Sequence, residues 1–75
     1  MMLEIGQEFN KNGSRYCLLE ILEYNLKKYV LFSVESEKIE YLFYEVFQEG
    51  KNYNFSLVTD EETKFALYEQ VEFGR

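Results

Sequence analysis

The side chains of this chain that could do chemistry are carboxylates, serines and one cysteine, because the sequence contains no histidine. Histidine is the usual general base near neutral pH and the commonest metal ligand. Cys17 therefore lacks the usual partner that would activate it as a nucleophile, and we expect it to be a small buried apolar residue. The serines, which stand in no recognisable nucleophile motif, are Ser14, Ser33, Ser36 and Ser56. We expect no catalytic residues and no enzymatic activity.

The carboxylates are numerous, but their spacing indicates neither a catalytic pair nor a metal site. Those in apolar runs are Glu20, Glu23, Glu40 and Glu45, and on an acidic surface such side chains are normally solvated. Asp60, Glu61 and Glu62 are consecutive and could attract a divalent cation. They lack the alternating oxygen ligands and the central glycine of a calcium-binding loop, and the positive end of a helix dipole accounts for them. We therefore expect no metal and no cofactor.

The charge and composition of the chain argue against two classes of partner. The formal net charge of −6 opposes nucleic-acid binding, which depends largely on lysine and arginine. Stacking of bases on the seven tyrosines and seven phenylalanines would need a positive groove around them. The chain has no apolar run near the ~18 residues that a membrane span needs, and its first residues do not resemble a signal peptide. A single cysteine favours a reducing compartment, so we expect a cytoplasmic protein that binds neither nucleic acid nor membrane.

Turn signals divide the chain of 75 residues into five short runs rich in β-branched and aromatic residues. The expected strands are 4–10, 15–24, 28–35, 39–48 and 52–58. Their short connections favour antiparallel neighbours, because parallel strands need long crossovers. Asn12-Gly13 is typical of a two-residue hairpin turn, which would pair Phe9 with Tyr16. The predicted fold class is α+β, mainly β: a single domain, 1–75, with a coiled five-stranded antiparallel meander and one C-terminal helix packed on the sheet.

The pattern changes after Val58 and predicts a helix at about 60–73. Thr59 and Glu62 have the spacing of a capping box, and Gly74 can end the helix in a left-handed conformation. The apolar side chains that share one arc of the helix are Phe65, Leu67, Tyr68 and Val71. We expect this arc to lie on the sheet.

Two predicted strands carry apolar side chains on both faces, whereas a strand with one solvent-exposed face would alternate apolar and polar residues. The stretch KIEYLFYEVF, residues 38–47, has Ile39, Tyr41, Phe43 and Phe47 on one face and Leu42, Tyr44 and Val46 on the other. In the second strand, Leu18 and Leu22 are expected to face away from Cys17, Leu19 and Ile21. We expect the helix, coiling of the sheet and a partner protein to cover these faces between them.

Residues 28–71 resemble a known family. An aromatic-aliphatic strand, KYVLFSV, is followed by a polar turn and a strand YLFYEV; a strand ending SLV then leads to an acidic DEE that opens the terminal helix. This order is similar to that of the YrzB-like family of small acidic bacterial proteins, a domain family of unknown function. The resemblance implies a soluble bacterial domain and supplies no activity.

These features predict a small acidic protein–protein interaction module. The partner is another protein or a second copy of the chain, and the sequence leaves both open. The expected interaction surface consists of Tyr41, Phe43, Tyr44, Phe47, Glu40 and Glu45, since aromatic residues are enriched at interface centres. An alternative is an acidic decoy or inhibitor that mimics nucleic acid on a basic protein, which would need its carboxylates on one continuous face.

Overall fold

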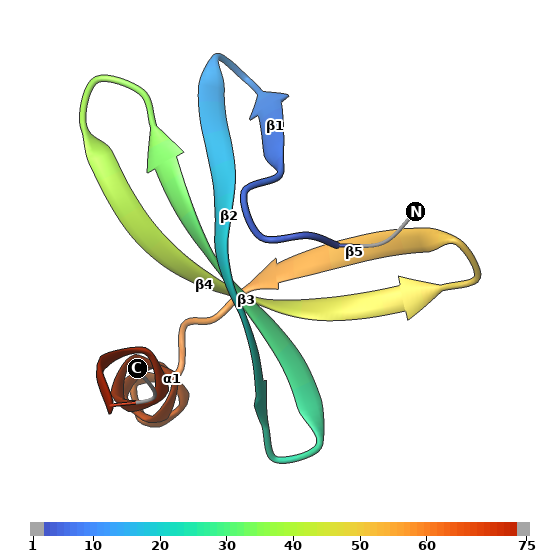
Figure 1. Cartoon of the computed structure of the whole chain (residues 1–75), viewed down its shortest axis with the longest axis vertical. Helices are drawn as coiled ribbons and strands as arrows, with labels where there is room; N and C mark the ends of the chain where they lie inside the picture. Colours follow the sequence, from blue (N-terminus) through green and yellow to red (C-terminus); the bar gives the residue numbers. More distant parts are fainter. Residues whose placement is uncertain (1–2, 74–75) are drawn as a thin grey trace.

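The computed structural model describes residues 3–73 as one five-stranded antiparallel sheet followed by a helix (Figure 1). The elements are β1 (Glu8–Lys11), β2 (Ser14–Tyr24), β3 (Lys27–Glu35), β4 (Ile39–Glu49), β5 (Asn52–Leu57) and α1 (Glu61–Phe73). Each strand pairs with the next one along the chain. The strands cross near the centre of Figure 1 and their hairpins splay outward, which shows how strongly the sheet twists and curls. The predicted fold class is confirmed.

The first hairpin turns at the predicted place, but its first strand is shorter than predicted. Asn12 and Gly13 both have positive φ, 51° and 80°, as the two-residue turn requires, and Phe9 lies opposite Tyr16. The expected strand 4–10 instead begins at Glu8. The residues before it form a turn in which Gly6 has a φ of 92° and the Gln7 N–H donates to the Glu4 carbonyl at 3.1 Å.

The sheet curls around Phe32, which lies at the centre of its concave face. The Phe32 side chain is only 4% exposed and forms a buried cluster with Leu18 and Val30. Four rings meet it edge-on, one from each of the other strands; they belong to Phe9, Tyr16, Tyr44 and Phe55, with centroids 6.0, 5.8, 5.5 and 5.5 Å away. Edge-to-face geometry is a favourable arrangement of aromatic pairs. Coiling therefore covers the concave face of the two-faced strands.

A β-bulge in β2 reverses its alternation halfway along. Leu18 lies opposite Phe32, but Glu20 lies opposite the next residue of β3, Leu31. Because one strand has an extra residue, each side chain after the bulge lies on the face opposite to the one that simple alternation along the sequence predicts. Leu22 consequently lies opposite Tyr29 on the convex face, so the prediction that it shares a face with Leu18 was wrong.

Helix α1 covers part of the convex face through a side that overlaps the predicted arc only at Leu67 and the half-buried Val71. Leu67 is fully buried and the helix packs chiefly against β2. The Gln70 side-chain amide donates to the Glu23 carbonyl at 3.0 Å. Phe65 and Tyr68 were expected on the sheet but are 66% and 55% exposed. The inward side is partly polar, so an arc chosen for its apolar residues alone does not match it.

Asp60 caps the helix, in place of the predicted Thr59–Glu62 capping box. The Asp60 Oδ2 accepts hydrogen bonds from the Thr63 N–H at 2.9 Å and from the Thr63 hydroxyl at 2.6 Å. These bonds, the hydroxyl first, lower the pKa of Asp60 below its ordinary value of 3.8. Gly74, expected to end the helix, lies outside the described residues.

We predict that Asp60→Ala lowers the melting temperature by several degrees at neutral pH, because it leaves helical N–H groups without their cap. Because the folded state lowers the pKa of Asp60, its stabilising effect is present above the ordinary pKa and is lost as the pH falls through the folded-state value. The melting curves of variant and parent, followed by circular dichroism, should therefore converge in acid.

Asp60→Asn is the matched control, since asparagine caps helices nearly as well, and it should retain most of the stability. Thr59→Ala should leave the melting temperature unchanged. An equal loss in Thr59→Ala and Asp60→Ala would contradict the assignment of the cap.

Candidate functional site

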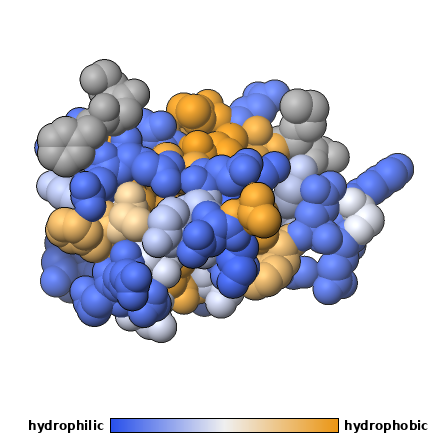
Figure 2. Space-filling view, turned by 90° about the horizontal axis from the view of Figure 1, so that it is seen from below, coloured by the Kyte–Doolittle hydropathy of each residue, from blue (hydrophilic) through white to orange (hydrophobic). Residues whose placement is uncertain are grey.

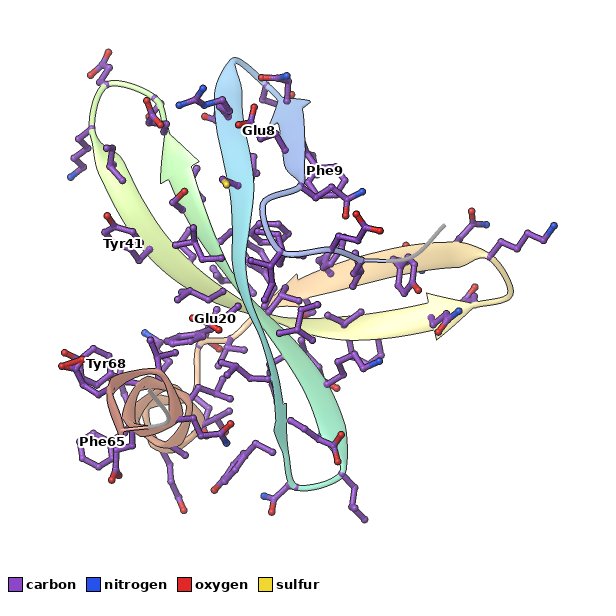
Figure 3. The ribbon with its side chains drawn as sticks, in the orientation of Figure 1. Glu8, Phe9, Glu20, Tyr41, Phe65 and Tyr68 are labelled. Carbon is purple, nitrogen blue, oxygen red and sulfur yellow. The ribbon has the colours of Figure 1, made fainter. Side chains whose placement is uncertain are left out.

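Aromatic side chains from β4 and α1 converge on a hollow between the sheet and the helix. We call it the aromatic groove; it has a volume of about 410 Å³, and its apolar lining includes Tyr41, Phe43, Leu57, Phe65 and Tyr68. Tyr41 is 65% exposed, about as much as Phe65. In Figure 3 these two side chains and Tyr68 lie on the same side of the molecule, Tyr41 from the sheet and the other two from the helix.

The positions of these rings follow from the geometry of their elements. Tyr41 lies opposite Ser33, and its neighbour Leu42 lies opposite the core residue Phe32; successive strand residues point to opposite faces, so Tyr41 points outward. On α1, burial of Leu67 against the sheet turns Phe65 and Tyr68, two positions before and one after it, away from the core. The groove is therefore positioned by the core contacts of Phe32 and Leu67.

The predicted surface residues do not form one surface. Tyr41 and Phe43 line the aromatic groove, whereas Phe47 lies at the other end of β4, opposite Asn54, and is 47% exposed. Glu45 is half-buried opposite Tyr29. The last two residues of the predicted set are Glu40 and Tyr44, which face the concave side opposite Val34 and Val30.

Tyr44 belongs to the core more than to a docking surface. Its ring meets Phe32 edge-on and is half-buried. Burial raises the pKa of Tyr44, and interaction with the nearby Tyr16 hydroxyl, including a hydrogen bond, raises it further. Its hydroxyl therefore keeps its proton at physiological pH.

Sequence reasoning missed three residues of the aromatic groove: Leu57, Phe65 and Tyr68. The sequence places Leu57 in the expected strand 52–58 without specifying its face, and it predicts that Phe65 and Tyr68 lie on the sheet. The available signal was the spacing of Thr63, Leu67 and Gln70, which places one polar, one apolar and one polar residue on one side of a helix. That side is the one turned inward, since Thr63 and Gln70 are half-buried and Leu67 is buried.

A second hollow lies on the concave side, between the two edge strands. It has a volume of about 490 Å³, and its aromatic lining consists of Phe9, Tyr16, Phe32, Tyr44, Tyr53 and Phe55. Several of these rings already pack against one another around Phe32. This hollow is therefore the solvent-accessible end of the core that the curled sheet encloses.

Acidic side chains are spread over the molecule. In the sheet, Glu40 lies on the concave face and Glu45 on the convex face, and further glutamates lie on α1. Glu35 pairs with Arg15 at 2.6 Å, and this hydrogen bond, followed by the charge of Glu35, raises the pKa of Arg15. Figure 2 shows a mosaic of apolar patches between hydrophilic side chains on the face seen from below.

Within residues 3–73, no group of three or more histidine, cysteine, aspartate or glutamate side chains is placed to hold a metal ion. No helix in that range is long and apolar enough to cross a membrane. Comparison of the chain with models of known families, with curated proteins and with solved structures found no match.

Proposed function

We propose that the protein is a small cytoplasmic protein–protein interaction module that binds its partner in the aromatic groove. The observation that carries the proposal is the convergence of Tyr41, Phe65 and Tyr68, each more than half exposed, on one hollow. Contiguous exposed apolar patches usually mark interaction sites, and tyrosine and phenylalanine are enriched at interface centres.

The free energy available from these rings supports the proposal. Burying a large apolar side chain contributes about 1.5–3 kcal/mol relative to leaving it exposed. Phe65 and Tyr68 each leave more than half of their surface in water. A partner that covers the aromatic groove would bury these two rings and gain this free energy.

The alternative of an acidic decoy has less support. A surrogate for nucleic acid needs its carboxylates in a continuous row, because the phosphates of a nucleic acid form such a row. Glutamates on opposite faces of β4, such as Glu40 and Glu45, do not form such a row. Membership of residues 28–71 in the YrzB-like family remains a proposal that is compatible with an interaction module and adds no activity to it.

The double substitution Phe65→Ala/Tyr68→Ala should abolish partner binding and leave the fold intact. Both side chains are more than half exposed, so the melting temperature should change little. Truncation of an aromatic hot-spot residue weakens an interface by about 2 kcal/mol or more. The measurement is affinity capture from cytoplasm, followed by titration calorimetry with the purified partner.

Phe47→Ala is the matched control, because Phe47 is an exposed ring on β4 outside the aromatic groove. It should capture the same partner as the parent protein. A partner that binds the double variant as tightly as the parent would show that the groove is not the docking site. Sedimentation across a concentration series separates a second copy of the chain from a different protein.

A further inference from the structure

The aromatic groove has an acidic frame on its helical side. Residues three and four positions apart are neighbours on a helix surface. By this spacing Phe65 is flanked by Glu61, Glu62 and Glu69, and Tyr68 by Glu72. All four glutamates are exposed.

The only basic residue of α1 does not neutralise this frame. Lys64 lines the groove, and its Nζ lies 3.3 Å from a carboxylate oxygen of Glu61. That pair accounts for one of the four negative charges, and Glu62, Glu69 and Glu72 retain theirs. The last turn of the helix carries no basic residue. A ligand that reaches Phe65 and Tyr68 therefore approaches through a negative field.

We propose that the occupant of the aromatic groove is a basic amphipathic segment of another protein, with apolar side chains on the rings and lysine or arginine on the surrounding glutamates. This inference rests on the proposed function and adds the chemistry of the partner. Complementary charge steers association and suppresses wrong partners, and cations also interact favourably with tyrosine and phenylalanine faces.

The same charges argue against a second copy of the chain as the occupant. Two copies that met through the groove would bring two acidic frames together, and each chain carries a formal net charge of −6. Juxtaposed like charges at an interface are costly. The negative charge of the frame therefore favours a different protein over a second copy of the chain, two partners between which the sequence does not decide.

Nuclear magnetic resonance titration of the full ¹⁵N-labelled chain with designed peptides tests the inference. The first peptide has about 18 residues, long enough to form a helix on binding, with leucine on one face and lysine on the other. The second peptide replaces each lysine with glutamate, and the third replaces each leucine with serine. We expect the first to bind and to shift amide resonances of 41–43, 57–59 and 61–69, with the other two at least about tenfold weaker. Its affinity should fall as salt screens the charges.

Variants of the acidic frame provide the second arm of the experiment. Glu69→Gln/Glu72→Gln should weaken binding of the lysine peptide several-fold and reduce its salt dependence. Glu49→Gln is the matched control, because Glu49 is an exposed glutamate at the end of β4, away from α1, and it should bind as the parent does. Both variants alter exposed side chains, and unchanged melting curves will establish that they fold.

The outcomes separate this inference from the proposed function. Equal or tighter binding of the glutamate peptide, with loss in Phe65→Ala/Tyr68→Ala, would overturn the basic partner and retain the groove as a docking site. Equal binding of the serine peptide would overturn the amphipathic requirement, and failure of the lysine peptide to bind would overturn the inference directly. Binding of the lysine peptide that persists in Phe65→Ala/Tyr68→Ala, or shifts that map elsewhere, would count against the groove itself.

Discussion

Phe32→Ala is expected to lower the free energy of unfolding by about 3–5 kcal/mol, the usual cost of removing a large buried aromatic ring. Phe32 is 4% exposed and is the ring that side chains from all four other strands contact. Small domains have a total stability of only about 5–15 kcal/mol. The substitution should therefore leave a large fraction of the chain unfolded at physiological temperature.

Urea denaturation followed by tyrosine fluorescence measures this loss. Phe32→Leu should be less destabilising, because it keeps much of the volume and removes only the edge-to-face contacts, which contribute about 0.5–1.5 kcal/mol per pair. Phe47→Ala removes the same side chain from a site that is 47% exposed and should cost less than about 1 kcal/mol. Similar losses in Phe32→Ala and Phe47→Ala would contradict the central role of Phe32.

Leu67→Ala is expected to cost about 2–5 kcal/mol and to release α1 from the sheet. Leu67 is the buried side chain of the helix, and the described side chains around it are half-buried or exposed. An isolated helix of 13 residues is marginal in water, so α1 needs this contact in order to persist. Because the same contact orients Phe65 and Tyr68, the variant should also lose partner binding although both rings remain in the sequence.

Amide hydrogen exchange distinguishes release of the helix from global unfolding. In Leu67→Ala the amides of α1 should exchange much faster than those of β2 and β3. The matched control is Tyr68→Ala, a neighbouring position that is 55% exposed, where exchange in α1 should stay close to that of the parent. Uniform protection of helix and sheet in Leu67→Ala would contradict the view that one side chain anchors the helix.

The sequence predicts this sheet well because local signals agree with the fold. Asn12-Gly13 can adopt positive φ in succession, so the turn and the pairing of Phe9 with Tyr16 follow from two residues. The N-terminal boundary was less predictable. Leu3 and Ile5 suit a strand, but the turn between Glu4 and Gln7 depends on hydrogen bonds that no residue type dictates.

The helix cap and the buried side of the helix are harder to predict from the sequence. For the cap, two neighbouring residues offer nearly the same interaction. Thr59 and Asp60 are both good N-caps, and which of them acts depends on where the chain leaves β5. The buried side of α1 includes Thr63 and Gln70, whose polar groups bond to Asp60 and to the β2 backbone. Hydrophobicity alone selects Phe65 and Tyr68 instead. The aromatic groove was missed for that reason.

The bulge in β2 has a consequence for comparing this chain with distant relatives. Loss of the one extra residue between Leu18 and Glu20 would restore simple pairing with β3 and would leave Leu18 opposite Phe32 and Glu20 opposite Leu31. A one-residue gap there in an alignment would therefore mark a strand without the bulge but with the same interior, and the positions on either side of the gap should keep their apolar or polar character.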